Sequence, residues 1–398
     1  MKTFKYNIPP GLRKMVLILC ILLVCLLSAF PLTASCKDIK IGLITTDKPV
    51  IIGSNQNGIL INSFTNNLIT KTTKREPYQV QNINGLIKIT DKSKNTFGAF
   101  RGPIKLIPQK KDGFVSCNNR WYRGELLLLT NGDKKNLTIV NNVELEDYLL
   151  GAVPSEVPGS WHKEALKAQS VAARSYSLGY LGRRIEKGYD LESTVEDQVY
   201  LGIAAEKRST THAVKETKGI ILLDKDNKPL IALYHSSGGG YTDSIDNLWD
   251  KKPSRHISDH IKARPDYDNN SPRFNWVRKH KTTELNNLLA NLNLGEITNI
   301  APLSRSIANR IMWIKITGTK GEITIRGEEF RKLLKLPSSK FNLAIENNTV
   351  KFTGRGYGHG LGMSQWGAKA LAERGFTYDK ILAHYYTEVK LARIEDVK

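Results

Sequence analysis

A single carboxylate in a constrained position is the residue of this chain best suited to acid–base chemistry. Glu156 lies between Pro154 and Pro158, with Ala152 and Val157 among its apolar neighbours. Proline fixes its own φ and disfavours the helical conformation in the residue before it, so we expect Glu156 on a stiff loop rather than on a helix. Apolar surroundings raise the pKa of a carboxylic acid and keep it protonated nearer neutral pH. Such a group can serve as a general acid, although most glutamates are solvated surface residues.

Two glycine-rich segments carry further polar groups that could meet a ligand. Residues 232–244 read A-L-Y-H-S-S-G-G-G-Y-T-D-S, and residues 354–368 read G-R-G-Y-G-H-G-L-G-M-S-Q-W-G-A. Glycine lets a backbone approach a ligand closely or adopt positive φ. The second segment lacks the G-K-[ST] ending of a phosphate-binding loop, and the first lacks the G-x-S-x-G elbow of a serine hydrolase. Neither nucleotide binding nor serine hydrolysis is therefore favoured.

A helix is expected directly after the Glu156 loop. Ser160 follows a Pro-Gly break and is a candidate N-cap, and Gly188 is a candidate stop for a helix that extends to about Lys187. Small residues recur at helical spacing along this segment, which predicts a face that packs closely. They are Ala165, Ala168, Ala172 and Ser175.

The segment around Glu156 resembles a known family. Residues 143–174 read V-E-L-E-D-Y-L-L-G-A-V-P-S-E-V-P-G-S-W-H-K-E-A-L-K-A-Q-S-V-A-A-R, and together with the two glycine-rich segments they are similar to the stage II sporulation protein D (SpoIID) and LytB amidase-enhancer family. The resemblance extends over about residues 120–393. It implies a peptidoglycan lytic transglycosylase whose catalytic Glu corresponds to Glu156. Val157 stands where the family commonly has Met.

The resemblance also implies a set of substrate-binding candidates. Arg174 is expected either to hold a carboxylate of the wall or to form an internal ion pair, and Gln198 and Tyr200 are expected to contact sugar or to be buried. Asp243 occupies a position where the family has Glu, and with Glu146 and Asp147 it is a fallback second carboxylate. No metal or cofactor is expected; His235 with His256 or His260 is the only metal-binding alternative. The other candidate substrate-binding residues are His235, Ser236, Ser237, His359, Ser364 and Gln365.

Hydrophobic patterning predicts a small β-rich N-terminal domain, and the resemblance implies that a mixed α/β catalytic domain of the SpoIID type follows it, so the expected fold class is α+β. Brief alternating runs separated by turn residues predict short strands over residues 37–138. Residues 139–395 form the predicted SpoIID/LytB-like domain. Residues 1–35 have a basic start and an apolar run, which is typical of a cleaved signal peptide, with an uncleaved membrane anchor as the alternative.

Charge and cysteine content limit the partners and the compartment. The formal net charge of +21 suggests an anionic partner, but basic residues are spread along the chain and no nucleic-acid motif accompanies them. Nucleic acid is therefore not an expected partner, and membrane contact is expected only through the N-terminal segment. Cys36 and Cys117 could form a disulfide after export or remain two separate thiols.

Two functions from different classes remain open. The first is an exported lytic transglycosylase that cleaves glycan strands, preferably strands without stem peptides, and forms 1,6-anhydro-muramic ends with one Glu as acid and base. The second is a wall-binding protein without enzymatic activity that activates an N-acetylmuramoyl-L-alanine amidase. A binder of nucleic acid or of a membrane surface is a third, weaker alternative.

Overall fold

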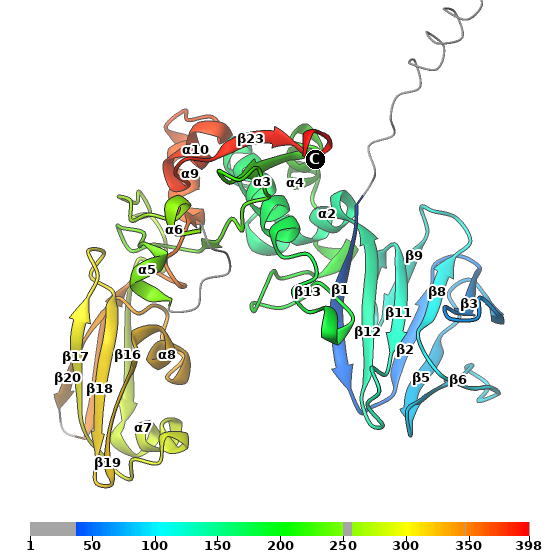
Figure 1. The fold of residues 1–398 in the computed structure, drawn as a ribbon, viewed down its shortest axis with the longest axis horizontal. Helices are drawn as coiled ribbons and strands as arrows, with labels where there is room; N and C mark the ends of the chain where they lie inside the picture. The colour runs from blue at the N-terminus through cyan, green and yellow to red at the C-terminus, as the bar shows by residue number, and fades with distance from the viewer. Residues whose placement is uncertain (1–36, 250–256, 347, 398) are drawn as a thin grey trace, which may run out of the picture. The chain divides into compact units, whose positions relative to one another are not determined.

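The β-rich N-terminal region contains two sheets that share one core, and their strands are antiparallel except for the parallel pair β1 and β13. The computed structural model describes residues 37–249, 257–346 and 348–397. A seven-stranded sheet has the order β13-β1-β12-β11-β8-β3-β4, and a six-stranded sheet has the order β10-β9-β2-β5-β6-β7 (Figure 1). The strands are β1 (Asp38–Thr46), β2 (Val50–Ser54), β3 (Gly58–Asn62), β4 (Leu68–Thr72), β5 (Tyr78–Ile83), β6 (Leu86–Thr90), β7 (Thr96–Phe100), β8 (Ile104–Pro108), β9 (Phe114–Cys117), β10 (Arg120–Arg123), β11 (Glu125–Leu129), β12 (Leu137–Glu144) and β13 (Leu191–Glu192).

Alternating side chains explain why these short segments form sheets. Ile39 and Ile41 of β1, Val80 of β5, and Ile87 and Ile89 of β6 are buried, while the residues between them are more exposed. One face of each strand thus contributes to a common core. The α+β fold class and the early short strands are confirmed. The predicted boundary at residue 138 falls inside β12, which pairs with β1 along its whole length.

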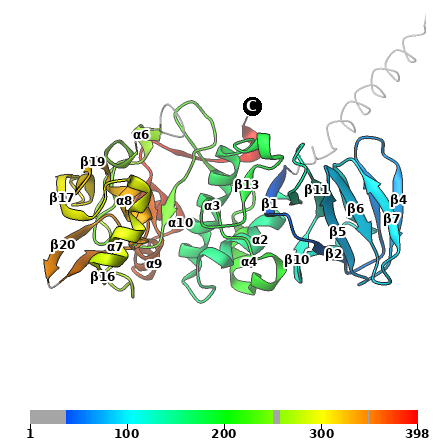
Figure 2. The ribbon, with the colours of Figure 1, turned by 90° about the horizontal axis from the view of Figure 1, so that it is seen from below.

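A helical region follows the sheets, and its central helix is α3. Helix α3 packs against α9 and α10 (Figures 1 and 2). Ala165, Ala168 and Ala172 of α3 are buried in one core with Leu371 of α9 and Leu382 of α10. The predicted small-residue face is therefore confirmed. The elements are α2 (Leu145–Glu156), α3 (Lys163–Gly179), α4 (Arg208–Glu216), β14 (Ile220–Leu223), β15 (Tyr234–His235), α5 (Ile245–Leu248), α6 (Ile257–His260), β22 (Met363–Ser364), α9 (Gln365–Glu373), α10 (Tyr378–Tyr385) and β23 (Lys390–Arg393).

The predicted ends of α3 were wrong. His162, not Ser160, caps the helix, and its Nδ1 accepts a hydrogen bond from the backbone N–H of Glu164 at 3.3 Å. The helix ends at Gly179 rather than near Lys187. A separate 3₁₀ turn, Ile185–Lys187, follows, and Gly188 terminates that turn with φ of 83°.

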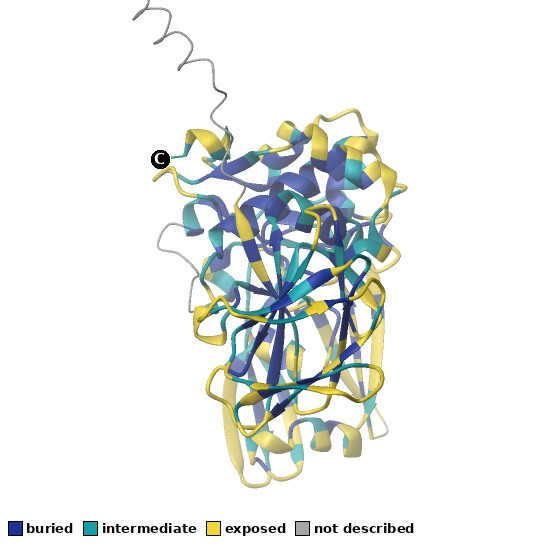
Figure 3. Ribbon diagram, turned by 90° about the vertical axis from the view of Figure 1, so that its right-hand side faces the viewer, coloured by how far each residue is buried: buried dark blue, intermediate teal, exposed yellow. Residues whose placement is uncertain are grey.

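A third region, inserted between β15 and β22, has a core of its own. Trp276, Ile314, Phe330 and Phe352 belong to this core, which is distinct from those of the sheets and of α3. Across the described residues, exposed positions concentrate in turns and loops (Figure 3). The elements are β16 (Asn275–Lys281), α7 (Thr282–Leu288), β17 (Ile297–Arg305), β18 (Ile311–Gly318), β19 (Gly321–Arg326), α8 (Gly327–Leu333), β20 (Phe341–Glu346) and β21 (Thr349–Arg355), with the sheet orders β16-β21-β20 and β17-β18-β19.

Some sequence predictions fall on residues that the structure does not describe. The N-terminal signal or anchor, Cys36 and His256 all lie outside the described ranges. Cys117 is buried in β9, where burial raises the pKa of its thiol to about 12. Within the described ranges, no helix has the length and apolar character needed to cross a bilayer.

Candidate functional site

Glu156 is the last residue of helix α2, so the predicted loop position was wrong. Pro154 lies inside the last turn of this helix. Proline cannot donate to the carbonyl four residues earlier and its ring crowds that carbonyl, and the helix continues only two residues beyond it. Val157 is extended, with φ of −135° and ψ of 146°, because Pro158 follows it. Pro158 therefore ends the helix and leaves Glu156 at its terminus.

The Glu156 carboxylate is held by neutral donors. The backbone N–H of Val199 donates to Oε1 at 2.8 Å, and the Gln365 side chain donates to Oε2 at 3.4 Å. Burial raises the pKa of Glu156 above its usual value, and the two hydrogen bonds oppose that shift only in part. No ion pair to this carboxylate is found among the described residues. Glu156 is therefore an acid that retains its proton to higher pH than an ordinary glutamate.

A parallel pairing brings the two glycine-rich segments together beside Glu156. Strand β15 pairs with β22, which places Tyr234 opposite Met363 and His235 opposite Ser364. The backbone N–H of Trp366 then donates to the Ser236 carbonyl at 3.1 Å. This pairing places Gln365 where its amide reaches Glu156. It also holds the half-buried Ser236 against Trp366, the residue after Gln365.

His235 and His359 are neutral groups that fix the backbone. His359 accepts from the N–H of Leu361 through Nδ1 at 3.0 Å, so Nε2 carries the proton and donates to the Tyr234 carbonyl at 2.9 Å. His235 Nδ1 lies 3.1 Å from the Leu361 carbonyl and donates to it. Burial lowers the pKa of His359 to about 4 and that of His235 well below its usual range. Each imidazole is therefore uncharged at neutral pH. Neither can serve as a general acid there, although each donates a hydrogen bond to a backbone carbonyl.

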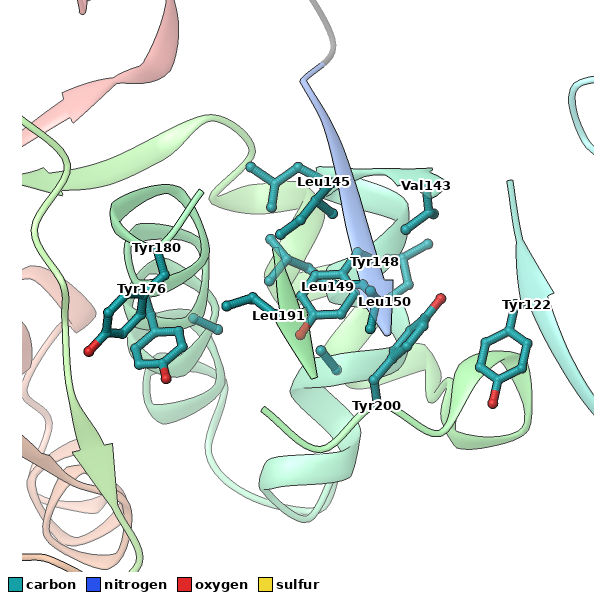
Figure 4. Close-up of a cluster of buried hydrophobic side chains, with 14 of the residues drawn as sticks. Tyr122, Val143, Leu145, Tyr148, Leu149, Leu150, Tyr176, Tyr180, Leu191 and Tyr200 are labelled. Atoms are coloured by element: carbon teal, nitrogen blue, oxygen red, sulfur yellow. The ribbon is translucent and has the colours of Figure 1, made fainter. Parts of the chain in front are cut away.

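Gln198 and Tyr200 are buried, and they flank Val199, whose backbone N–H contacts Glu156. Gln198 Oε1 accepts from the hydroxyls of Tyr148 at 2.9 Å and Ser177 at 2.8 Å, and Nε2 donates to the Tyr234 hydroxyl at 2.9 Å. The Tyr200 ring packs against the Tyr148 ring, with the two ring centroids 4.8 Å apart (Figure 4). These contacts fix the backbone of Val199 and therefore position its N–H toward Glu156.

Arg174 forms the internal ion pair that was one of its two expected roles. Its Nε and Nη2 atoms each donate to the Glu146 carboxylate at 2.8 Å, and its side chain is 0% exposed. The remaining donors reach the Ile220 and Val214 carbonyls. Arg174 therefore joins α3 to the start of α2 and is not available to substrate.

Ser237 and Ser364 are also used within the protein. The Ser237 hydroxyl donates to Asp268, and Ser364 Oγ accepts from the N–H of Gly367 at 3.2 Å as the N-cap of α9. Of the nine predicted substrate-binding residues, Gln365 is the one whose side chain contacts Glu156, and the Ser236 carbonyl bonds to the next residue, Trp366. The side chains of the other seven make contacts within the protein.

The fallback carboxylates occupy other places. Asp243 is fully buried and accepts from the N–H of Ser244 at 2.8 Å and from Asn247 Nδ2 at 2.7 Å. Asp147 lies 3.9 Å from Arg123, and Glu146 is paired with Arg174. No group of three or more candidate metal ligands is present among the described residues.

Two tryptophans near Glu156 were not identified from the sequence as a pair. Trp161 and Trp366 are partly exposed, and their rings meet edge to face with centroids 5.2 Å apart. Trp366 directly follows Gln365. Exposed aromatic faces provide rigid apolar surface for a ligand. Each tryptophan is visible in its motif, but only folding brings the two segments together.

Asp268 is a second residue that the sequence did not single out. It accepts from the N–H groups of Gly239 at 2.7 Å and Gly240 at 2.8 Å, in addition to the Ser237 hydroxyl. The neighbouring Asp266 accepts from the N–H of Gly238 at 3.0 Å. Burial raises the pKa of Asp266 to about 7, and nearby Asp268 adds to that shift. The two aspartates fix the serine–glycine loop.

Comparison with known proteins identifies relatives over most of the chain. Residues 133–223 match the family described as stage II sporulation protein, and residues 211–362 match a domain of unknown function. Stage II sporulation protein D of Bacillus amyloliquefaciens is 30% identical over 271 residues, which are 64% of this chain and 76% of that protein. An uncharacterised protein of Brachyspira hyodysenteriae is 32% identical over 304 residues, which are 75% of this chain and 78% of that protein. A Bacillus subtilis protein named amidase enhancer is 30% identical over 292 residues, or 60% of this chain and 39% of the relative.

Proposed function

The chain belongs to the stage II sporulation protein D family, and from this premise we propose that it is a lytic transglycosylase acting on peptidoglycan glycan strands outside the cytoplasm. The observation that supports this proposal most directly is the state of Glu156. It is a half-buried carboxylate with a raised pKa, it accepts hydrogen bonds only from neutral donors, and no ion pair to it is found among the described residues. A general acid requires this state.

One carboxylate is sufficient because the substrate supplies the nucleophile. Glu156 donates its proton to the glycosidic oxygen, and the bond from muramic acid C1 to that oxygen breaks as positive charge develops at C1. The C6 hydroxyl of the same muramic acid then attacks C1 through its oxygen and returns its proton to Glu156. The products are a 1,6-anhydro-muramic end and a free hydroxyl on the leaving sugar, and the acid is regenerated.

The surrounding groups position the sugar. The Gln365 amide contacts Glu156, the next residue Trp366 binds the Ser236 carbonyl through its N–H, and Trp366 and Trp161 together offer aromatic surface. A hydrolase with two carboxylates would need a second acid near the first. Asp243 and Glu146 are instead occupied by protein donors, as described above. The single-acid mechanism is therefore the one that this site favours.

The experiment is digestion of purified glycan strands that an amidase has freed of stem peptides. The full chain should generate 1,6-anhydro-muramic ends detectable by mass spectrometry, and Glu156→Gln should generate none above background. Glu206→Gln is the matched control, because Glu206 pairs with Arg123 rather than contacting Glu156. Strand cleavage by Glu156→Gln at the native rate would contradict the proposal.

A second function is favoured by one specific observation. One relative is named amidase enhancer, so this chain could instead bind the wall and activate an N-acetylmuramoyl-L-alanine amidase without cleaving glycan. In that case Glu156→Gln would stimulate the amidase as well as the native chain does. Anhydro ends from the native chain alone, with no amidase present in the reaction, would exclude a purely non-enzymatic role.

A further inference from the structure

One face of the three-stranded sheet β16-β21-β20 is open to solvent and carries positive charge. On the other face Trp276, Val350 and Phe352 are buried in the core of the inserted region. Side chains alternate along a strand, and residues directly opposite one another on paired strands share a face. The open face therefore includes four exposed cations, which are Lys279 and Lys281 of β16 and Lys351 and Arg355 of β21.

The arrangement of these cations is unfavourable for the sheet by itself. Lys279 and Lys351 lie directly opposite one another in the register of β16 and β21. Like charges in this position repel and destabilise a sheet. In the described part of the chain, no ion pair is found for any cation of the open face. Glu346, opposite Thr349 at the end of β20, is the acidic residue of this face. An anionic partner would relieve the repulsion.

A groove of about 660 Å³ continues the open face at the end where Arg355 lies. Arg305 and Lys340, both half-buried, also line it, and its lining includes no Asp or Glu. Arg305 donates to the carbonyls of Asn309 and Phe341, and Lys340 Nζ donates to a carbonyl at 2.8 Å, so their acceptors are neutral. Burial lowers the pKa of Lys340 to about 8, and neighbouring cations lower it further.

The shape of this surface favours a thread-like partner over a flat one. A bilayer surface would meet the exposed cations of the sheet but would not enter a groove. The groove holds the half-buried Arg305 and Lys340, which a linear polymer can reach. A linear polyanion can therefore contact both the open face and the groove, whereas an anionic membrane can contact only the first.

The spacing of the cations fits a polymer with one negative charge for every six backbone bonds. Lys279 and Lys281 are alternate residues of one strand, so six bonds separate their Cα atoms, which lie about 6.7 Å apart. In a glycerol phosphate polymer, six bonds likewise separate neighbouring phosphorus atoms, and its extended repeat is therefore about 7 Å. Each repeat carries one phosphodiester charge, which ammonium and guanidinium groups bind through charge-assisted hydrogen bonds.

A single-stranded nucleic acid has the same number of bonds between its phosphates, but its bases require a further feature. Proteins that bind single strands stack the bases on aromatic side chains. The residues of β16, β21 and β20 on the open face include no Phe, Tyr or Trp, since the aromatic residues of these strands belong to the buried core. The open face thus fits a phosphodiester polymer without bases.

We propose that the open face of β16-β21-β20 and the adjoining groove bind a polyol phosphate polymer, with Lys279, Lys281, Lys351 and Arg355 on its phosphodiester groups and Arg305 and Lys340 at its end in the groove. This inference goes beyond the proposed function. It takes from that function only the location outside the cytoplasm, and it does not involve Glu156.

The test measures binding by the full native chain to four probes. They are poly(glycerol phosphate), uncharged polyglycerol of the same length, a deoxythymidine oligonucleotide, and vesicles that contain phosphatidylglycerol. The chain should bind poly(glycerol phosphate), and its affinity should fall steeply as salt is added, because counterions are released on binding. The other three probes should bind at least about tenfold more weakly.

A double variant separates binding from folding. Lys279→Gln with Lys351→Gln should weaken binding of poly(glycerol phosphate) about tenfold and lower the slope of log affinity against log salt by roughly one. The free energy of unfolding, measured by urea denaturation, should stay the same or rise, because the repulsion between opposed lysines is removed. A purely structural role for these lysines would instead make the variant less stable.

A matched variant controls for net charge. Lys320→Gln with Lys332→Gln also removes two exposed positive charges from the inserted region, but neither residue belongs to the open face or the groove. Its affinity for poly(glycerol phosphate) should stay within about twofold of the native value, because charges away from the contact are screened by salt.

Three results would overturn the inference. They are equal affinity for charged and uncharged polymer, native affinity in the Lys279 and Lys351 double variant, and tighter binding of the oligonucleotide or the vesicles than of poly(glycerol phosphate). The Glu156→Gln chain should bind the polymer as the native chain does. If the native chain bound it but made no anhydro-muramic ends, the proposed enzymatic function would fail and this assignment would stand.

Discussion

Helix α2 carries two glutamates in opposite environments, Glu146 in its first turn and Glu156 at its end. Glu146 receives two hydrogen bonds of 2.8 Å from the fully buried guanidinium of Arg174. Glu156 receives one from a backbone N–H and one from an amide, and burial raises its pKa. The same residue type on one helix is thus an ion-paired structural group in one place and a candidate acid in the other. The elements packed against α2 decide which.

A similar contrast separates the cations. Arg174 is paired inside the protein, whereas Arg305, Lys340 and Arg355 face a groove that has no acidic lining. An unpaired charge is costly to retain near a protein interior. Arg305 and Lys340 are half-buried and carry part of that cost, whereas Arg355 is exposed.

The largest expected effect follows from Glu156→Gln. Strand cleavage should fall by about 10²- to 10⁴-fold, the usual contribution of a general acid, as measured by the yield of anhydro-muramic ends. The free energy of unfolding at neutral pH should stay the same or rise. The folded-state pKa of Glu156 is raised, so the native chain loses stability as the pH rises through that value, and glutamine does not titrate. A large loss of stability in Glu156→Gln would contradict the contrast drawn between Glu156 and the ion-paired Glu146.

Glu146→Gln should have the opposite profile. Removing one partner of a buried ion pair leaves the Arg174 charge uncompensated and should lower the free energy of unfolding by about 3–5 kcal/mol, measured by urea denaturation. Cleavage per folded molecule should change little. The double variant Glu146→Gln, Arg174→Met should recover part of the loss, because it removes the buried charge as well. If the single and double variants lost equal free energy of unfolding, the uncompensated charge of Arg174 would not be the cause of the loss.

Gln365→Leu should produce a smaller change with a defined pH signature. The Gln365 amide lowers the pKa of Glu156, so its removal should move the high-pH limb of the cleavage profile further upward. The rate at the optimum should fall less than about tenfold, since a single weak hydrogen bond is lost. Gln365→Glu should shift the same limb upward as well, through repulsion between two carboxylates. A profile that moves downward in the leucine variant would be inconsistent with this role.

The smallest expected effect concerns Lys340. Its pKa of about 8 means that it loses its charge as the pH rises through that value. The charged groups that act on it are Arg310, Arg355, Asp268 and Asp243. Binding of poly(glycerol phosphate) should therefore weaken by a few fold between pH 7 and about pH 9. Lys340→Arg should bind equally at both pH values, because its guanidinium remains protonated.

Much of the fold was predictable because short alternating strands and the small-residue face of α3 are local patterns. The position of Glu156 was mispredicted for a physical reason. Two prolines indicate a loop, but α2 continues two residues beyond Pro154, and Pro158 lies outside the helix. The cap of α3 was missed because His162 is an uncommon capping residue.

The sequence by itself determined the family, the α+β class and the identity of the one acid worth testing. Only the tertiary structure decided what surrounds that acid. Its two donors are separated from it by 43 and 209 residues, and the partner of Arg174 lies 28 residues away. Pairing and pKa depend on distances of a few ångströms between such remote residues, and those distances exist only once α2, α3 and the paired strands β15 and β22 have packed together.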